Sequence, residues 1–304
     1  NSSVTVNNST ISGNYGAASG GGISSESNTS SSSNYAVTSI VTINNSTIND
    51  NLASLRGGGI FSRCLSSSPS ASSLITLENS TLTGNSVSSG SGGGIWSTCT
   101  SNNSLIIDNS TIFGNSASNS GGGIQVNSSN ASIEVTSSII STEVGNGTNI
   151  GYNGTFISNG YNIFSDAPTG AISSDQTNII TSNLNLQPLA FNGGSTQTMI
   201  PGLGSIAIDA GNPVDLTDAQ NRSILGIRDV GAAEHNCVTN EMDIETACGS
   251  YTWLNGITYT TNNSTDTHTV LSTVDGVCDT IYTLNLILGN GIYPFISMVQ
   301  YNRL

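Results

Sequence analysis

The side chains that could perform acid–base chemistry are few in the repeated part of this chain. Glu78 and Asp108 each stand directly before the asparagine of an Asn-Ser-Thr motif. Stacked motifs would place the two carboxylates about 5 Å apart, where they could hold a cation or act as the acid pair of a retaining glycosidase. A solvated pair of acids is the simpler interpretation. His235 and His268 lie outside the repeats with no nucleophile beside them in any motif, so we predict no catalytic residue.

A second group of oxygen donors lies in a loop that is rich in Gly and Pro. The group consists of Asp209, Asn212, Asp215 and Asp218. Carboxylate and amide oxygens are calcium ligands, although the spacing is not that of a known calcium loop. The alternative is a set of structural ion pairs with Arg222 or Arg228. We therefore predict no resident cofactor, and these four residues are the only calcium candidates.

An internal repeat must position these groups. Asn-Ser-Thr motifs begin at residues 8, 45, 79 and 109, and Gly-Gly-Gly-Ile motifs begin at 20, 57, 92 and 121. Within a repeat the two motifs are 12 or 13 residues apart, whereas the Ser-, Asn- and Thr-rich segment after the second motif varies in length. A fixed part followed by a variable part is typical of a solenoid, in which stacked strands keep their register and one corner loop can grow.

Aliphatic residues alternate within each repeat, which is the pattern of strands with one buried face. Three columns are aliphatic in every repeat: Val4/Val41/Ile75/Leu105, Val6/Ile43/Leu77/Ile107 and Ile11/Ile48/Leu82/Ile112. A single coil cannot bury these side chains, but stacked coils can. The sequence therefore predicts an all-β protein with a right-handed single-stranded parallel β-helix. The repeats span residues 1–145, final coils and a charged cap for the open end span 146–234, and a small β domain spans 235–304.

Two columns of asparagine fall at the expected corners of the coils. They are Asn8/Asn45/Asn79/Asn109 and Asn14/Asn51/Asn85/Asn115. Asparagine tolerates left-handed backbone conformations, and its amide can bond to an identical amide in the next coil. We expect both columns to form internal ladders, with exposed amides for glycan contact as the alternative.

Cys64 and Cys99 each follow the isoleucine of a glycine motif by four residues. Equivalent positions in adjacent coils lie about 4.8 Å apart, within the range that a disulfide accepts. We predict this disulfide, which implies oxidising surroundings. Phe61 and Trp96 directly follow the same isoleucines, so they form either an outward platform for sugar stacking or a pair packed under the corner loops.

Composition excludes several classes of partner. The chain has 19 acidic residues against 5 basic ones and a net charge of −14, which argues against nucleic acid and anionic membrane surfaces. No apolar run approaches the roughly 20 residues of a membrane span. The chain begins in the middle of a coil, so we expect it to be part of a longer protein.

Polysaccharide-degrading and ice-binding activities remain alternatives for such a fold. A lyase needs a basic residue beside a uronate, yet the chain has no Lys and the repeats hold only Arg56 and Arg63. Ice binding needs regular outward Thr pairs. One complete column exists (Thr10/Thr47/Thr81/Thr111), but its neighbour reads Ser12/Asn49/Thr83/Phe113, so the pairing fails in three of four coils.

The repeats resemble those of bacterial β-helix surface proteins of the polymorphic outer-membrane protein type. The segments Leu186–Leu189, Asn192–Thr198, Pro201–Gly211 and Asp229–Glu234 are similar to the choice-of-anchor Q domain of secreted bacterial proteins. That resemblance implies a module that ends a β-helix and precedes a variable anchoring element.

Residues 246–286 resemble a small β module of Bacteroidetes-type adhesins. The resemblance implies a disulfide between Cys248 and Cys278, with Cys237 as a free thiol or replacement partner; residues 289–304 depart from the pattern. From all these features we expect a non-catalytic, extracellular or cell-surface protein with an adhesin-like or structural role. Its expected partners are glycans or cell-surface proteins.

Overall fold

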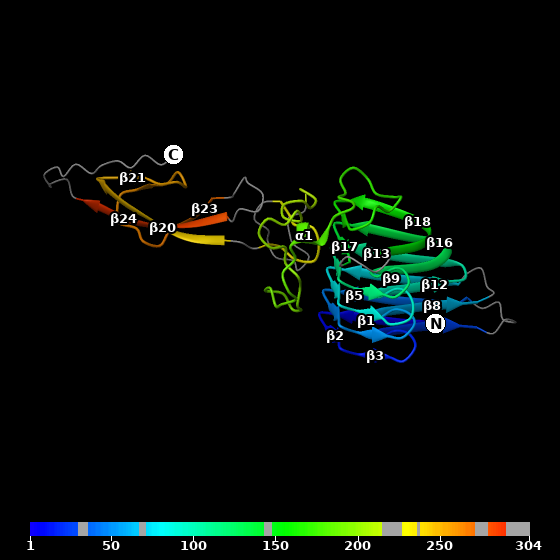
Figure 1. Ribbon diagram of the computed structural model, residues 1–304. Coiled ribbons are helices and arrows are strands. Elements are labelled where there is room, and N and C mark those ends of the chain that lie inside the picture. Colours follow the sequence, from blue (N-terminus) through cyan, green and yellow to red (C-terminus); the bar gives the residue numbers. More distant parts are fainter. Residues whose placement is uncertain are drawn as a thin grey trace. The chain divides into compact units, whose positions relative to one another are not determined.

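The chain divides into two compact units, Asn1–His235 and Asn236–Leu304 (Figure 1). The computed structural model describes residues 1–29, 36–66, 71–142, 148–214, 227–235, 238–270 and 279–289. Within these residues, no helix is long and apolar enough to cross a membrane.

The first unit is a single-stranded parallel β-helix, as predicted. The first two coils contain β1 (Ser2–Asn7), β2 (Thr10–Ser12), β3 (Tyr15–Gly16), β4 (Ile23–Asn28), β5 (Thr38–Asn44), β6 (Thr47–Asn49), β7 (Leu52–Ala53) and β8 (Ile60–Leu65). The next coils contain β9 (Ser72–Glu78), β10 (Thr81–Thr83), β11 (Ser86–Val87), β12 (Ile95–Cys99), β13 (Asn102–Asp108), β14 (Thr111–Phe113), β15 (Ser116–Ala117), β16 (Ile124–Thr136), β17 (Ile139–Ser141), β18 (Ile150–Gly160) and β19 (Ile163–Phe164). Each strand pairs in parallel with its equivalent in the next coil, and the motif residues align, as in Thr10↔Thr47 and Ile23↔Ile60.

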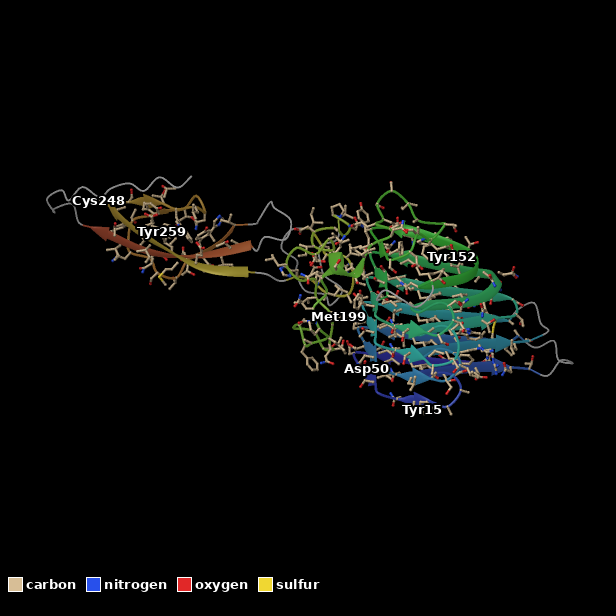
Figure 2. The ribbon with its side chains drawn as sticks, in the orientation of Figure 1. Tyr15, Asp50, Tyr152, Met199, Cys248 and Tyr259 are labelled. Atoms are coloured by element: carbon tan, nitrogen blue, oxygen red, sulfur yellow. A yellow bond between two sulfur atoms is a disulfide. The ribbon has the colours of Figure 1, made fainter. Side chains whose placement is uncertain are left out.

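Three stacked sheets form the walls of this unit. The long sheet has the order β1-β5-β9-β13-β16-β12-β8-β4, and β18 also pairs with β16. Strands β1, β5, β9 and β13 form one flank of it and β4, β8 and β12 form the other, while β16 runs through both because it has no corner loop to interrupt it. The shorter sheets are β19-β17-β14-β10-β6-β2 and β15-β11-β7-β3. Tyr15 and Tyr152 mark the first and last coils (Figure 2).

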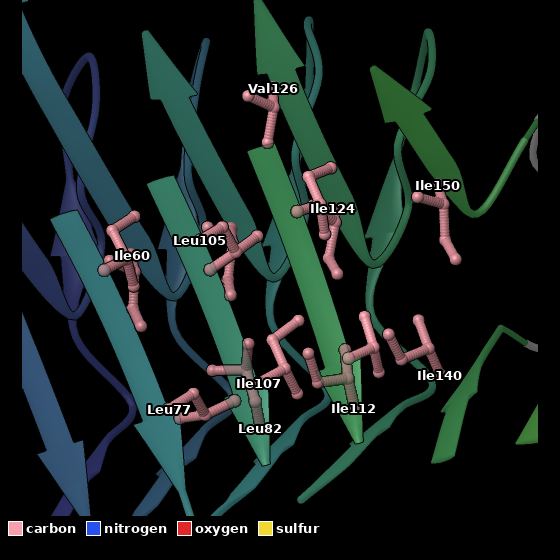
Figure 3. Close-up of a cluster of buried hydrophobic side chains, with 14 of the residues drawn as sticks. Ile60, Leu77, Leu82, Leu105, Ile107, Ile112, Ile124, Val126, Ile140 and Ile150 are labelled. Atoms are coloured by element: carbon pink, nitrogen blue, oxygen red, sulfur yellow. The ribbon is translucent and has the colours of Figure 1, made fainter. Parts of the chain in front are cut away.

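The predicted aliphatic columns form one continuous core. Ile43, Leu77, Ile107 and Ile112 are fully buried, and Figure 3 shows the last three of them within the core. In the first coil the equivalent side chains pack against this core but are only partly buried, because only one neighbouring coil covers them. Stacking therefore supplies the burial that a single coil lacks.

The two asparagine columns behave differently. Asn14, Asn51, Asn85 and Asn115 form the predicted ladder, in which each Nδ2 donates to the next Oδ1 at 2.9 Å; we call it the asparagine row. In the other column, the asparagines adopt left-handed φ angles of 47° to 51°, as expected. The predicted ladder of their amides is wrong, because the following serines make it instead. The backbone N–H of Ser46 donates to Ser80 Oγ, and that of Ser80 donates to Ser110 Oγ.

The narrow corner between the two flanks of the long sheet is filled by small polar and sulfur-containing side chains. Hydroxyls of Ser2, Ser25, Ser39, Ser62 and Ser73 bond one to the next at 2.7 to 2.9 Å; we call these residues the serine row. Beside it, Cys64 and Cys99 form the predicted disulfide with a Cα–Cα distance of 4.6 Å. Small hydroxyls that bond to each other fill this corner without unpaired polar atoms.

Residues 165–179 close the last coil. Asp166 Oδ2 accepts the backbone N–H groups of Asn149 and Ile150, and Asp175 Oδ1 accepts both the N–H and the side-chain amide of Asn162. The carboxylates therefore bond donors that would otherwise point into the next coil. Gly170 packs directly on the carbonyl of Phe156, where no side chain would fit.

The chain then follows the outer side of the six-stranded sheet. We call residues 184–214 and 227–235 the strap; α1 (Thr181–Leu184) leads into it. Thr47 Oγ1 donates to Gln197 O, and the N–H of Ala232 donates to Thr111 Oγ1. Leu184, Ala207 and Val230 share a second hydrophobic cluster with Ile139 and Ile163. The expected cap for the open end thus corresponds to residues 165–179, and the strap covers a side wall instead.

The second unit has a three-stranded sheet in the order β20 (Val238–Cys248), β24 (Asp279–Gly289), β23 (Thr267–Val270). The hairpin of β21 (Tyr251–Thr252) and β22 (Thr258–Tyr259) turns at Asn255-Gly256, where Gly256 has φ 77°. Trp253 and Tyr259 pack with Leu284 and Leu286. Cys237 and Cys278 lie outside the described residues, so the Cys248–Cys278 disulfide stays a prediction; residues 290–304 also lie outside them.

Candidate functional site

The outward side of β1, β5, β9, β13 and residues 131–136 of β16 is a regular surface of the first unit; we call it the open face. Its side chains form three columns: Ser3/Ile40/Leu74/Ser104/Ser132, Thr5/Thr42/Thr76/Ile106/Glu134 and Asn7/Asn44/Glu78/Asp108/Thr136. Every one of them is exposed or half-buried. Neighbouring positions lie about 4.8 Å apart along a column and about 6.6 Å apart between columns.

The open face combines hydrogen-bonding groups with a small apolar centre. Thr42 and Thr76 lie beside Ile40, Leu74 and Ile106, so hydroxyls and amides surround aliphatic side chains. A sugar ring likewise carries hydroxyls at its edge and C–H groups on its faces. The face therefore matches the chemistry of an extended glycan, and its core-facing side is held rigid by the buried columns.

The structure brings Glu78 and Asp108 into register on this face, as the sequence predicts. Asn44 Nδ2 donates to Asn7 Oδ1 at 3.1 Å in the same column. Within the described residues, no group of three or more His, Cys, Asp or Glu side chains is placed to hold a metal ion. The two carboxylates thus add negative charge to one edge of the open face.

The threonine column considered for ice binding is not a free surface. Thr47, Thr81 and Thr111 are at most 1% exposed, because the strap covers the sheet that carries them. Thr47 Oγ1 and Thr111 Oγ1 bond to the backbone of the strap. Ice could bind to these threonines only if the strap did not cover them, so their burial argues against ice binding on this sheet.

Phe61 and Trp96 stack on each other with ring centroids 5.0 Å apart and are 1% and 5% exposed. The guanidinium of Arg56 lies 5.0 Å from the Trp96 ring centroid, and that of Arg63 lies 5.8 Å from that of Phe61. Arg63 also pairs with Glu26. The two rings are therefore packed within the protein, and the alternative of an outward sugar platform is not supported by their burial.

The calcium candidates are only partly described. Asp215, Asp218 and Arg222 lie outside the described residues. The backbone N–H of Asp209 donates to Asp229 Oδ1 at 2.9 Å, and Asn212 Oδ1 accepts the N–H of Val214. Calcium binding at this loop stays a prediction.

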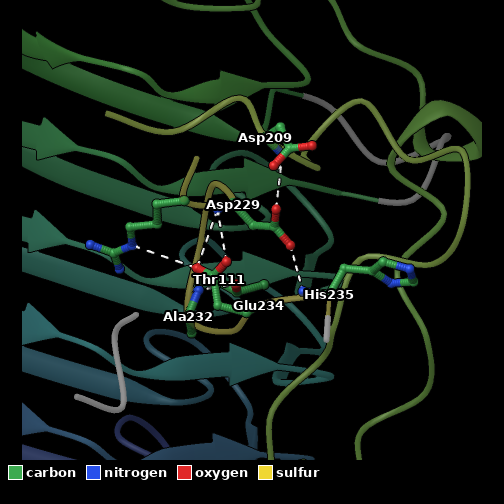
Figure 4. A network of polar contacts seen from close by, with 7 residues as sticks. Thr111, Asp209, Asp229, Ala232, Glu234 and His235 are labelled. Carbon is green, nitrogen blue, oxygen red and sulfur yellow. Dashed lines mark hydrogen bonds and ion pairs between the residues drawn. The ribbon is translucent and has the colours of Figure 1, made fainter. Parts of the chain in front are cut away.

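A buried polar network lies nearby in the strap (Figure 4). Arg228 Nε lies 3.9 Å from Glu234 Oε1, and both side chains are buried. Asp229 accepts the backbone N–H groups of Asp209 and His235, and its own N–H donates to Glu234. Burial raises the pKa of the Asp229 carboxyl from 3.8 to about 6, although the two backbone hydrogen bonds act to lower it. The network connects residues 209, 228–229 and 234–235 of the strap to one another. In the sequence these residues were noticeable only as a concentration of charge.

A scan against protein-family models finds no match to the chain, and searches of curated proteins and of solved structures find none either. Neither the serine row nor the apolar centre of the open face was predicted from the sequence. An alignment of the outward strand positions, like that of the inward ones, would have revealed the apolar centre.

Proposed function

We propose that the chain is a non-catalytic, extracellular or cell-surface β-helix with an adhesin-like role, which binds an extended polysaccharide on its open face. The observation that carries the proposal is the open face itself: three columns of mainly Ser, Thr, Asn and acidic side chains in fixed register around Ile40, Leu74 and Ile106. Its regular spacing suits a ligand that repeats along its length.

Two further observations support the proposal. The Cys64–Cys99 disulfide is typical of proteins in oxidising, extracytoplasmic surroundings. The internal ladders and the strap tie successive coils together, and a stiff surface loses little conformational entropy when it binds.

The test is a glycan-array experiment on the full chain, with calcium and with chelator, in which soluble product is measured in the same wells. The variant Thr42→Val with Thr76→Val removes two hydroxyls from the open face and keeps the β-branched shape. Two lost hydrogen bonds at about 0.5–1.5 kcal/mol each total about 1–3 kcal/mol, so we expect affinity to fall about 5- to 150-fold. Thr267→Val, an exposed position of β23 in the second unit, is the matched control and should bind normally.

Each other outcome has a defined meaning. Unchanged binding in the double variant would show that the ligand binds elsewhere, and would refute the open face as the binding site. Release of product from any polysaccharide would refute the non-catalytic role. An array without any binding would refute carbohydrate recognition and would direct the search to protein partners.

A further inference from the structure

The second unit contains a parallel strand pair with one face that no other described segment covers. Strands β20 and β24 pair in parallel over eleven residues. One side of the pair packs against Trp253 and Tyr259 through Leu284 and Leu286. Parallel strands in known proteins are almost always covered on both sides, so the other side is an unusual surface.

That uncovered side is apolar at its centre. Met242, Ile244 and Ile287 are 64%, 65% and 53% exposed. The register places Met242 beside Thr283 and Ile244 beside Asn285, and Asn285 Nδ2 contacts Met242 Sδ. Large apolar side chains that adjoin on a sheet are typical of interaction sites.

Strand β20 is also an edge strand among the described strands of its sheet. Its alternate residues Glu241, Asp243 and Glu245 point to the opposite side from Met242 and Ile244. Asp243 accepts the indole N–H of Trp253 at 2.8 Å. The edge thus presents one apolar row and one acidic row along the same strand, next to backbone groups that can pair with an added strand.

We propose that β20 binds an extended segment of another protein by strand addition, and that this segment alternates apolar residues with Lys or Arg. The apolar residues would cover the row of Met242 and Ile244. The basic residues would lie beside the acidic row, because cross-strand pairs of opposite charge stabilise a sheet. This proposal concerns the second unit and does not depend on the function proposed for the open face.

A second copy of the chain is the less suitable occupant. Antiparallel pairing of two β20 strands about Asp243 would place Asp243 opposite its own copy and Glu241 opposite Glu245. Like charges directly opposite each other destabilise a strand pair, and the net charge of −14 adds repulsion between whole chains. The charge of the strand therefore selects a basic partner.

The experiment uses the full chain and a capped synthetic peptide, equal in length to β20, that alternates valine and lysine. A matched peptide carries glutamate in place of lysine. We expect the lysine peptide to bind saturably, at least about tenfold more tightly than the glutamate peptide at low salt, with the difference shrinking as salt screens the charges. Glu241→Lys should weaken the lysine peptide and strengthen the glutamate peptide.

A second variant tests the apolar row. Ile244→Asn should abolish binding, whereas Ile257→Asn, an exposed apolar residue in the hairpin turn, should not change it. Equal binding of both peptides, or binding of neither, would overturn the proposal. A chain that dimerises in sedimentation, and becomes monomeric with Ile244→Asn, would identify a second copy as the occupant and overturn it as well.

Discussion

The buried amide of Asn85 is the point at which the coils are most tightly connected through side chains. Its Oδ1 accepts the backbone N–H and the Nδ2 of Asn51 at 3.1 and 2.9 Å. Its Nδ2 donates to Ile48 O and Asn115 Oδ1, both at 2.9 Å, and also lies 3.1 Å from Thr83 O within its own coil. Asn85→Ala removes the four hydrogen bonds to neighbouring coils, together with the one to Thr83 O, and leaves the buried N–H of Asn51 without its partner.

The size of the effect follows from the geometry. Four hydrogen bonds at about 1 kcal/mol each predict a loss of about 4 kcal/mol in the free energy of unfolding. Asn14 occupies the same row in the first coil, but its side chain is exposed and makes only the bonds to Ser12 O and Asn51 Oδ1. Water can replace both, so Asn14→Ala should cost less than about 1 kcal/mol.

The assay is urea unfolding followed by circular dichroism, with the disulfide intact. Because stacked repeats can unfold piecewise, hydrogen exchange of the Asn51 amide provides a local measurement, and exchange should accelerate in Asn85→Ala. Equal losses in the two variants, or a loss below about 1 kcal/mol for Asn85→Ala, would show that the asparagine row contributes no more when buried than when exposed, and the reasoning would fail.

Two further predictions concern the strap and the glycine corners. The raised pKa of Asp229 means that its carboxyl favours the folded state when protonated: this contribution is complete below pH 3.8 and is lost as the pH rises through about 6. Relative to Asp229→Asn, the wild type should therefore lose at most about 3 kcal/mol of its free energy of unfolding between these pH values. Urea unfolding of both proteins at a series of pH values measures this. The same dependence of the free energy of unfolding on pH in both proteins would contradict the prediction. A Cβ at Gly94 would lie 2.5 Å from Gly123 O, whereas one at Gly13 would meet nothing within 4 Å; Gly94→Ala should cost more than about 2 kcal/mol. Gly13→Asn should be nearly neutral, since Asp50 adopts φ 55° at the equivalent corner; urea unfolding followed by circular dichroism measures both glycine variants.

The inward columns and the Cys64–Cys99 pair could be predicted because each depends only on register between neighbouring coils. A fixed spacing of motifs determines which residues stack, and stacking determines burial. The hydrogen bonds that link Ser46 to Ser80 and Ser80 to Ser110 were not predicted. Asn45 and Ser46 are both polar corner residues, and only the left-handed φ of Asn45 decides which side chain points to the next coil. The course of the strap follows from contacts such as Thr47 with Gln197, 150 residues apart, for which no local pattern exists.

The open face was less predictable than the core. Outward positions carry no requirement for burial, so Thr42, Ile106 and Glu134 can share one column without violating any periodicity. The parallel pairing of β20 with β24 is similar in this respect, since β23 and the hairpin lie between them in sequence and composition does not reveal the strand order.

The serine row has a fixed polarity along the solenoid. Ser25 donates to Ser2, and a hydroxyl has a single proton, so each serine further along must donate to the one before it. All these O–H bonds therefore point toward the first coil, while the amides of the asparagine row donate toward the later coils. The two rows are opposed lines of dipoles at two different corners of the same coils, so their axial fields partly cancel over the first three coils.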